Sequence, residues 1–130
     1  MAQTKLQATG LRHEYYQPRT GGRLLALENI NLQVEDGEFV TIVGPSGCGK
    51  TTFINLCDGL LKPTAGRIDI DGKQVTGPGT DRGMVFQDSC LMPWRTVMKN
   101  VLFGLECQGL DNAEGMERAK KFIKLVGLGG

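Results

Sequence analysis

A glycine-rich loop constrains the fold of this 130-residue chain more than any other feature of its sequence. Residues 44–51 read Gly-Pro-Ser-Gly-Cys-Gly-Lys-Thr and match the pattern G-x-x-x-x-G-K-[ST] in full. The almost continuously apolar residues 39–43 before the loop predict a strand buried on both faces. The apolar spacing of residues 50–61 after it predicts a helix that Pro63 ends. A strand, a loop and a helix in this order indicate an α/β fold.

The residues of this loop are those that a phosphate cradle needs. Glycines let successive backbone N–H groups surround an anionic oxygen, and a helix N-terminus adds unpaired N–H groups and partial positive charge. Lys50 is placed to reach the β- and γ-phosphates, Thr51 to bind Mg²⁺ through its hydroxyl, and Thr52 to touch the α-phosphate side. A glycine-rich turn that binds nothing would need neither the strand nor the helix, so we favour a nucleotide site. Its predicted residues are Gly44, Pro45, Ser46, Gly47, Cys48, Gly49, Lys50, Thr51 and Thr52.

Further strands are predicted on both sides of the loop. Residues 30–34 and 66–72 alternate apolar and polar side chains, as half-buried strands do. An Asp-Gly turn follows the first segment and closes the second, and residues 83–86 form a short apolar strand candidate.

Helices are predicted from residue 96 onward. Thr96 is placed to cap the first of them. Asp111 and Glu114 have capping-box spacing before a second apolar stripe, which ends at Gly127.

Composition excludes several classes of protein. With 15 Lys+Arg against 14 Asp+Glu the net charge is +1, which argues against an electrostatic nucleic-acid or anionic-membrane binder. No apolar run approaches the ~20 residues of a membrane-spanning helix, and the polar residues 1–10 do not resemble a secretory signal. The four cysteines lack the paired spacing of a zinc site, so we expect free, buried thiols in a reducing cytosol.

Three segments of the chain resemble the ATP-binding subunit of an ABC transporter, in particular the bacterial importers for nitrate, taurine and aliphatic sulfonates. They are Pro-Ser-Gly-Cys-Gly-Lys within the loop, Gly-Met-Val-Phe-Gln at residues 83–87, and residues 91–106. The resemblance implies a P-loop NTPase core with an antiparallel β subdomain, and ATP and Mg²⁺ as ligands. It also implies hydrolysis of ATP that drives uptake of a small anion.

The same resemblance assigns roles to residues outside the loop. Gln87 corresponds to the family's Q-loop glutamine, which binds Mg²⁺ and helps to place the attacking water, so Lys50 and Gln87 are the predicted catalytic residues. Tyr15 corresponds to an aromatic residue that stacks on adenine, although the adjacent Tyr16 is an alternative. His13, the only histidine, is expected at the surface.

The resemblance also implies partners and a location. The segment near Gln87 and Trp94 would meet the membrane permease, and Trp94 is either an interface anchor or a partly buried core residue. A second ATP-binding subunit would complete a homodimer, and a periplasmic binding protein would act indirectly. No nucleic-acid partner is expected. The implied location is cytoplasmic, peripheral on the inner face of the membrane.

Part of the family pattern does not occur in residues 1–130. The family continues with a Leu-Ser-Gly-Gly-Gln-type signature, an apolar strand ending in Asp-Glu (the Walker B segment) and a switch histidine, none of which is present here. We therefore expect residues 1–130 to be the N-terminal part of one nucleotide-binding domain, truncated before these segments.

Two other interpretations stay open at this point. One is a P-loop small-molecule kinase or GTPase, although the guanine-reading Asn-Lys-x-Asp motif is absent. The other is a fragment that binds nucleotide without hydrolysing it, because the catalytic glutamate is missing and loss of a general base costs about 10²–10⁴-fold in rate.

Overall fold

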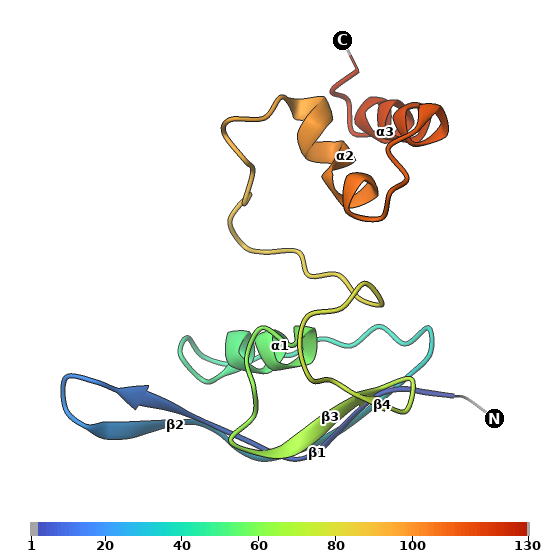
Figure 1. The fold of residues 1–130 in the computed structure, drawn as a ribbon. Coiled ribbons are helices and arrows are strands. Elements are labelled where there is room, and N and C mark those ends of the chain that lie inside the picture. The colour runs from blue at the N-terminus through green and yellow to red at the C-terminus, as the bar shows by residue number, and fades with distance from the viewer. Residues whose placement is uncertain (1–2, 130) are drawn as a thin grey trace. The chain divides into compact units, whose positions relative to one another are not determined.

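The computed structural model describes residues 3–129 and divides into two compact units, Met1–Met84 (unit 1) and Val85–Gly130 (unit 2). Figure 1 shows that unit 1 holds the strands and helix α1, whereas unit 2 holds helices α2 and α3. No helix of the described residues is both long enough and apolar enough to cross a membrane.

Unit 1 is built on an antiparallel sheet with the strand order β2-β1-β3-β4. Strands β1 (Thr4–Gln17) and β2 (Gly22–Glu35) form a long hairpin, and β3 (Ala65–Ile70) pairs with the other edge of β1. The Asp-Gly turn at residues 71–72 then leads into the short β4 (Lys73–Gln74). The predicted strands at residues 30–34 and 66–72 and the antiparallel β subdomain are thus confirmed, although β2 begins much earlier than expected.

Helix α1 (Lys50–Asp58) lies across one face of this sheet (Figure 1). It directs Phe53 and Leu56 into the sheet's apolar face, and full burial of one such side chain stabilises the fold by about 1.5–3 kcal/mol. The buried core of unit 1 consists of Ala8, Leu11, Leu27, Phe53, Leu56, Ile68 and Ile70. The start of α1 at Lys50 agrees with the sequence prediction.

The end of α1 differs from the prediction. The helix stops at Asp58 because Gly59 adopts a left-handed conformation (φ 80°), which L-residues with a side chain rarely do. The N–H of Leu60 then donates to the carbonyl of Asn55 at 2.9 Å, which closes the last turn. The prediction that Pro63 ends this helix is therefore wrong: the glycine ends it first.

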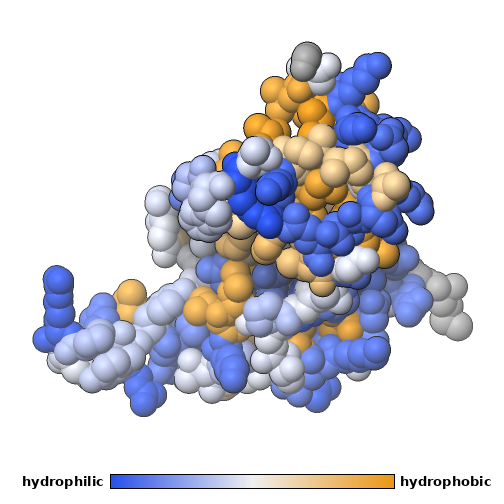
Figure 2. Space-filling view, turned by 45° about the horizontal axis from the view of Figure 1, so that its top comes forward, coloured by the Kyte–Doolittle hydropathy of each residue, from blue (hydrophilic) through white to orange (hydrophobic). Residues whose placement is uncertain are grey.

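The buried strand predicted at residues 39–43 is not formed. This segment is irregular, and Phe39 and Val43 are 92% and 86% exposed. A strand buried on both faces needs paired neighbours and covering layers, and β1 to β4 supply neither to this segment. The predicted strand at residues 83–86 is also absent, and Val85 is exposed. Figure 2 shows apolar residues, in orange, on the surface in view.

Unit 2 contains α2 (Val97–Cys107) and α3 (Ala113–Leu125). Thr96 caps α2 as predicted, since its hydroxyl oxygen accepts from the Lys99 N–H at 3.3 Å. The cap of α3 is Asn112, whose Oδ1 accepts from the Gly115 N–H at 3.0 Å. The predicted capping box that begins at Asp111 is wrong by one residue, because the extended backbone that a cap requires falls at Asn112.

Candidate functional site

The glycine-rich loop packs against β2 immediately before α1. Gly49 caps α1 with φ 100°, and a Cβ on it would lie only 2.7 Å from the Ala26 carbonyl oxygen and from Leu27 Cδ2. A side chain at this position would therefore meet both an unfavourable backbone conformation and a backbone oxygen. Glycine is required here because the loop turns into the helix directly on the surface of β2.

Lys50 lies on the inner side of this loop. Its ammonium donates to the carbonyl oxygens of Gly44 and Pro45, each at 2.7 Å, and reaches Cys48 Sγ at 3.5 Å. The charge is thus directed into the curve of the loop, where the backbone also presents the start of α1. A phosphate oxygen entering there would replace neutral carbonyl partners by a charged one, and charge-assisted hydrogen bonds are the stronger kind.

The first turn of α1 carries two hydroxyl groups in different surroundings. Thr51 is exposed, whereas Thr52 is buried. The Thr52 hydroxyl lies 3.1 Å from the Tyr15 hydroxyl, which comes from β1. The fold therefore brings Tyr15 to the first turn of α1, beside the glycine-rich loop, across 37 residues of sequence.

The two adjacent tyrosines differ in their contacts. Tyr15 is 36% exposed and contacts Thr52, whereas Tyr16 is 67% exposed. The geometry favours Tyr15 over Tyr16 as the aromatic residue beside the loop. The residue next to Tyr15 in space, His13, is 8% exposed, so the predicted surface position of this histidine is wrong. Its Nδ1 lies 3.0 Å from the Lys62 carbonyl oxygen, a partner far away in sequence that periodicity does not reveal.

Gln87 and Trp94 belong to unit 2, and both are exposed. Because Trp94 is 80% exposed, its interpretation as a partly buried core residue is wrong. Its role as an interface anchor and the role of Gln87 as a ligand remain predictions from the sequence.

The cysteines also depart from expectation. The prediction of buried thiols is wrong for three of them, because Cys48, Cys90 and Cys107 are exposed. Cys48 and Cys90 lie in irregular segments, and Cys107 lies at the end of α2. Cys57 is half-buried on α1, and burial raises the pKa of its thiol to about 11. Cys57 is therefore a neutral thiol at physiological pH.

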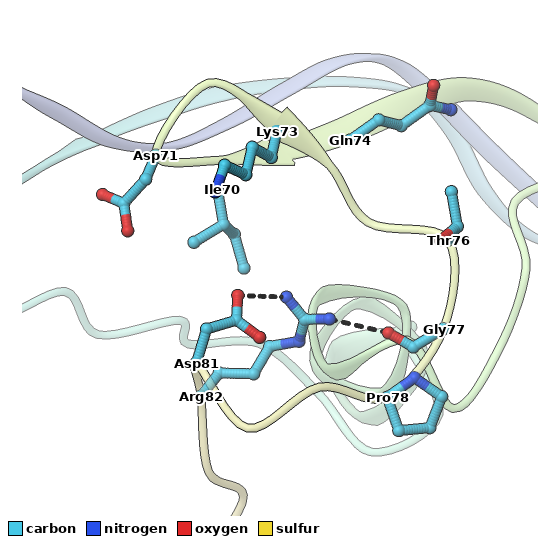
Figure 3. A pocket seen from close by; sticks show the side chains of 9 residues that line it. All are labelled: Ile70, Asp71, Lys73, Gln74, Thr76, Gly77, Pro78, Asp81 and Arg82. Carbon is cyan, nitrogen blue, oxygen red and sulfur yellow. Dashed lines mark hydrogen bonds and ion pairs between the residues drawn. The ribbon is translucent and has the colours of Figure 1, made fainter.

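A cavity of about 380 Å³ lies at the opposite end of α1 from the glycine-rich loop. Figure 3 shows Arg82 in its wall, donating to Asp81 at 2.8 Å and to the Gly77 carbonyl at 2.6 Å. The Arg82 side chain also donates to the carbonyl of Asp58 at 3.3 Å. These bonds join the segment after β4 to the end of α1. They also pair the charge of Arg82 within the protein, so Arg82 is not free to bind an anion in this cavity.

Comparison with known proteins shows the family to which the chain is similar. The family model described as ABC transporter matches residues 27–130. An uncharacterized ABC transporter ATP-binding protein of Methanocaldococcus jannaschii is 60% identical over 110 residues, which are 85% of this chain and 41% of that protein. A nitrate import ATP-binding protein of Synechocystis is 49% identical over 123 residues, or 95% of this chain and 46% of that protein.

Two further matches are informative. A taurine import ATP-binding protein of Burkholderia pseudomallei is 50% identical over 109 residues, which are 84% of this chain and 42% of that protein. A solved ATP-binding cassette, a dimer in a post-hydrolysis state bound to ADP and Pi, matches with a TM-score of 0.76 and 30% identity. That match covers 92% of this chain and 56% of the solved chain. The present chain thus spans less than half the length of these curated relatives.

Proposed function

Because this chain belongs to the ABC transporter family, as an ATP-binding domain of P-loop NTPase fold, we propose that its residues 44–52 bind the phosphates of Mg²⁺-ATP. The observation that carries the proposal is the position of Lys50, whose ammonium lies 2.7 Å from two carbonyl oxygens on the inner side of the loop. The loop amides and the N-terminus of α1 supply the remaining positive potential.

The hydroxyl of Thr51 fits Mg²⁺ as an oxygen donor at the loop. Mg²⁺ prefers a few protein oxygens together with phosphate oxygens and water. The exposed Thr51 hydroxyl would be one such protein ligand. The resemblance to the family assigns a second oxygen ligand to the side chain of Gln87. The bound ion would neutralise charge on the β- and γ-phosphates, and Lys50 would do the same from the loop side.

Adenine recognition is proposed for Tyr15. Its ring is half-exposed beside Thr52, and a base stacked on an aromatic ring gains about 1–3 kcal/mol. Thr52 would then contact both the Tyr15 hydroxyl and the α-phosphate side of the nucleotide.

For the complete protein we propose ATP hydrolysis that drives import of a small anion such as nitrate, taurine or a sulfonate. The names of two relatives, a nitrate and a taurine import ATP-binding protein, support this class of substrate. Residues 1–130 would form the N-terminal part of one nucleotide-binding domain. A second copy of the subunit would complete a homodimer, and a periplasmic binding protein would deliver the anion.

The exposed Trp94 and the segment around Gln87 are proposed to meet the membrane permease on the cytoplasmic face. Tryptophan is enriched among the residues that contribute most to binding at protein interfaces, and Trp94 is 80% exposed.

The nucleotide proposal is tested by calorimetric titration of the chain with Mg²⁺-ATP. Lys50→Ala should abolish binding, because it removes the charge inside the loop but no core contact. Lys120→Ala is the matched control, since Lys120 is an exposed lysine on α3 paired only with Glu117. Unchanged affinity in Lys50→Ala would remove the proposal.

A further inference from the structure

Three side chains connect β1 to the first turn of α1. His13 Nδ1 lies 3.0 Å from the Lys62 carbonyl oxygen, and since a carbonyl only accepts, Nδ1 carries a proton and donates. The His13 ring meets the Tyr15 ring edge-on, with 4.7 Å between the centroids and 83° between the planes. The Tyr15 hydroxyl in turn lies 3.1 Å from Thr52 Oγ1.

The three residues His13, Tyr15 and Thr52 differ in their exposure to solvent. His13 and Thr52 are 8% and 7% exposed, whereas Tyr15 between them is 36% exposed. The tyrosine ring is therefore held at its edge and at its hydroxyl by two buried groups, while part of it stays open to solvent. Edge-to-face aromatic pairs are favourable in their own right, so His13 constrains the ring and does not only fill space.

The backbone around His13 is also fixed. The Glu14 N–H donates to the Thr64 hydroxyl at 2.9 Å, and the Thr64 N–H donates to the Arg12 carbonyl at 2.8 Å. These two bonds join β1 to the segment that follows α1, at a point where the pairing of β1 with β2 is irregular between His13 and Glu14. The imidazole thus projects from an anchored piece of chain.

We infer that His13 is a positioning residue that orients the Tyr15 ring for adenine before the nucleotide arrives, an inference that rests on the proposed nucleotide function. A ring already held in its binding orientation loses less conformational freedom when the base stacks on it. His13 itself touches no nucleotide. Its contribution should concern the base and not the phosphates, which Lys50 and the loop bind independently.

The test compares two ligands on the full chain: Mg²⁺-ATP, and inorganic tripolyphosphate, which has the phosphates without the base. His13→Leu should weaken ATP binding about threefold to tenfold, the range of one lost hydrogen bond, and leave tripolyphosphate affinity unchanged. His13→Phe keeps an aromatic edge against Tyr15 and should retain more ATP affinity than His13→Leu.

Tyr15→Phe removes only the oxygen that contacts Thr52. It tests the orientation of the same ring in case a His13 variant fails to fold. It should also weaken ATP selectively. Equal loss of both ligands in the folded variants, or unchanged affinity for both, would overturn the inference. A wild-type chain that binds neither ligand would instead refute the proposed nucleotide site itself, so the two failures are distinct.

Discussion

The Lys50 ammonium lies 3.5 Å from the sulfur of Cys48 on the inner side of the glycine-rich loop. Cys48 is exposed, so its thiol is accessible at the place where the phosphates of a nucleotide would bind. A single sulfur atom can therefore report whether this space is filled.

We predict that a maleimide modifies Cys48 early and abolishes ATP binding, because the adduct fills the loop. Mg²⁺-ATP should slow this modification at least severalfold. Two other cysteines serve as controls. Cys107, exposed at the end of α2, should react equally with and without nucleotide. Cys57 should react slowly because burial raises the pKa of its thiol to about 11. Peptide mapping after brief labelling measures all three. Labelling of Cys48 that ATP does not change would contradict the prediction.

The glycines of the loop offer a matched pair of substitutions. Gly47 and Gly49 both have positive φ, but a Cβ on Gly47 meets nothing within 4 Å, whereas one on Gly49 meets the Ala26 carbonyl at 2.7 Å. Gly47→Ala should cost about 1–2 kcal/mol of unfolding free energy through backbone strain alone. Gly49→Ala should cost roughly 2–4 kcal/mol, because the helix start must also move away from β2. Urea denaturation of both variants measures the difference, and equal costs would show that contact with β2 does not matter.

The parts of the fold that sequence could predict are those with local causes. The start of α1 follows from the motif that ends in Lys50-Thr51, the capping of α2 from Thr96, and strand β3 from its alternating side chains. Each of these signals acts within a few residues of the element that it specifies.

The predictions that were wrong depend either on two signals that could each end a helix or on contacts between residues far apart in sequence. Gly59 ends α1 before Pro63 can, since either residue suffices and the first one along the chain decides. Residues 39–43 are apolar enough for a buried strand, but burial depends on neighbours that the four strands of this sheet do not supply.

The same distinction holds at the candidate site. The loop residues are predicted from one contiguous motif. The buried position of His13 was not, because it depends on Lys62 and Tyr15, which only the folded sheet brings to it. The preference for Tyr15 over Tyr16 likewise rests on Thr52, across the fold.

Helix α3 provides a direct comparison between the expected cap and the observed one. Asn112→Ala should reduce the stability of unit 2 by about 1 kcal/mol, because it removes the oxygen that accepts from the Gly115 N–H. Asp111→Ala, one residue earlier, should have a much smaller effect. Thermal unfolding followed by far-UV circular dichroism compares the two variants. A larger loss in Asp111→Ala would restore the capping box that the sequence suggested.

The last prediction concerns turnover by a polypeptide of residues 1–130. These residues supply the loop, Lys50 and Thr51, which bind and neutralise phosphate, but no apolar strand ending in Asp-Glu that would provide a general base. Since a general base contributes about 10²–10⁴-fold to rate, phosphate release from ATP should be negligible even where ATP binds.

The measurement is steady-state phosphate release at saturating Mg²⁺-ATP, with Lys50→Ala as the background. That variant keeps the core contacts of α1 and loses the ammonium and its two hydrogen bonds to loop carbonyls. Wild-type release should not exceed this background while calorimetry still detects binding in the wild type. Steady release that disappears in Lys50→Ala would mean that these residues already contain a group that activates water. The exposed carboxylates of the chain would then have to be searched for that group.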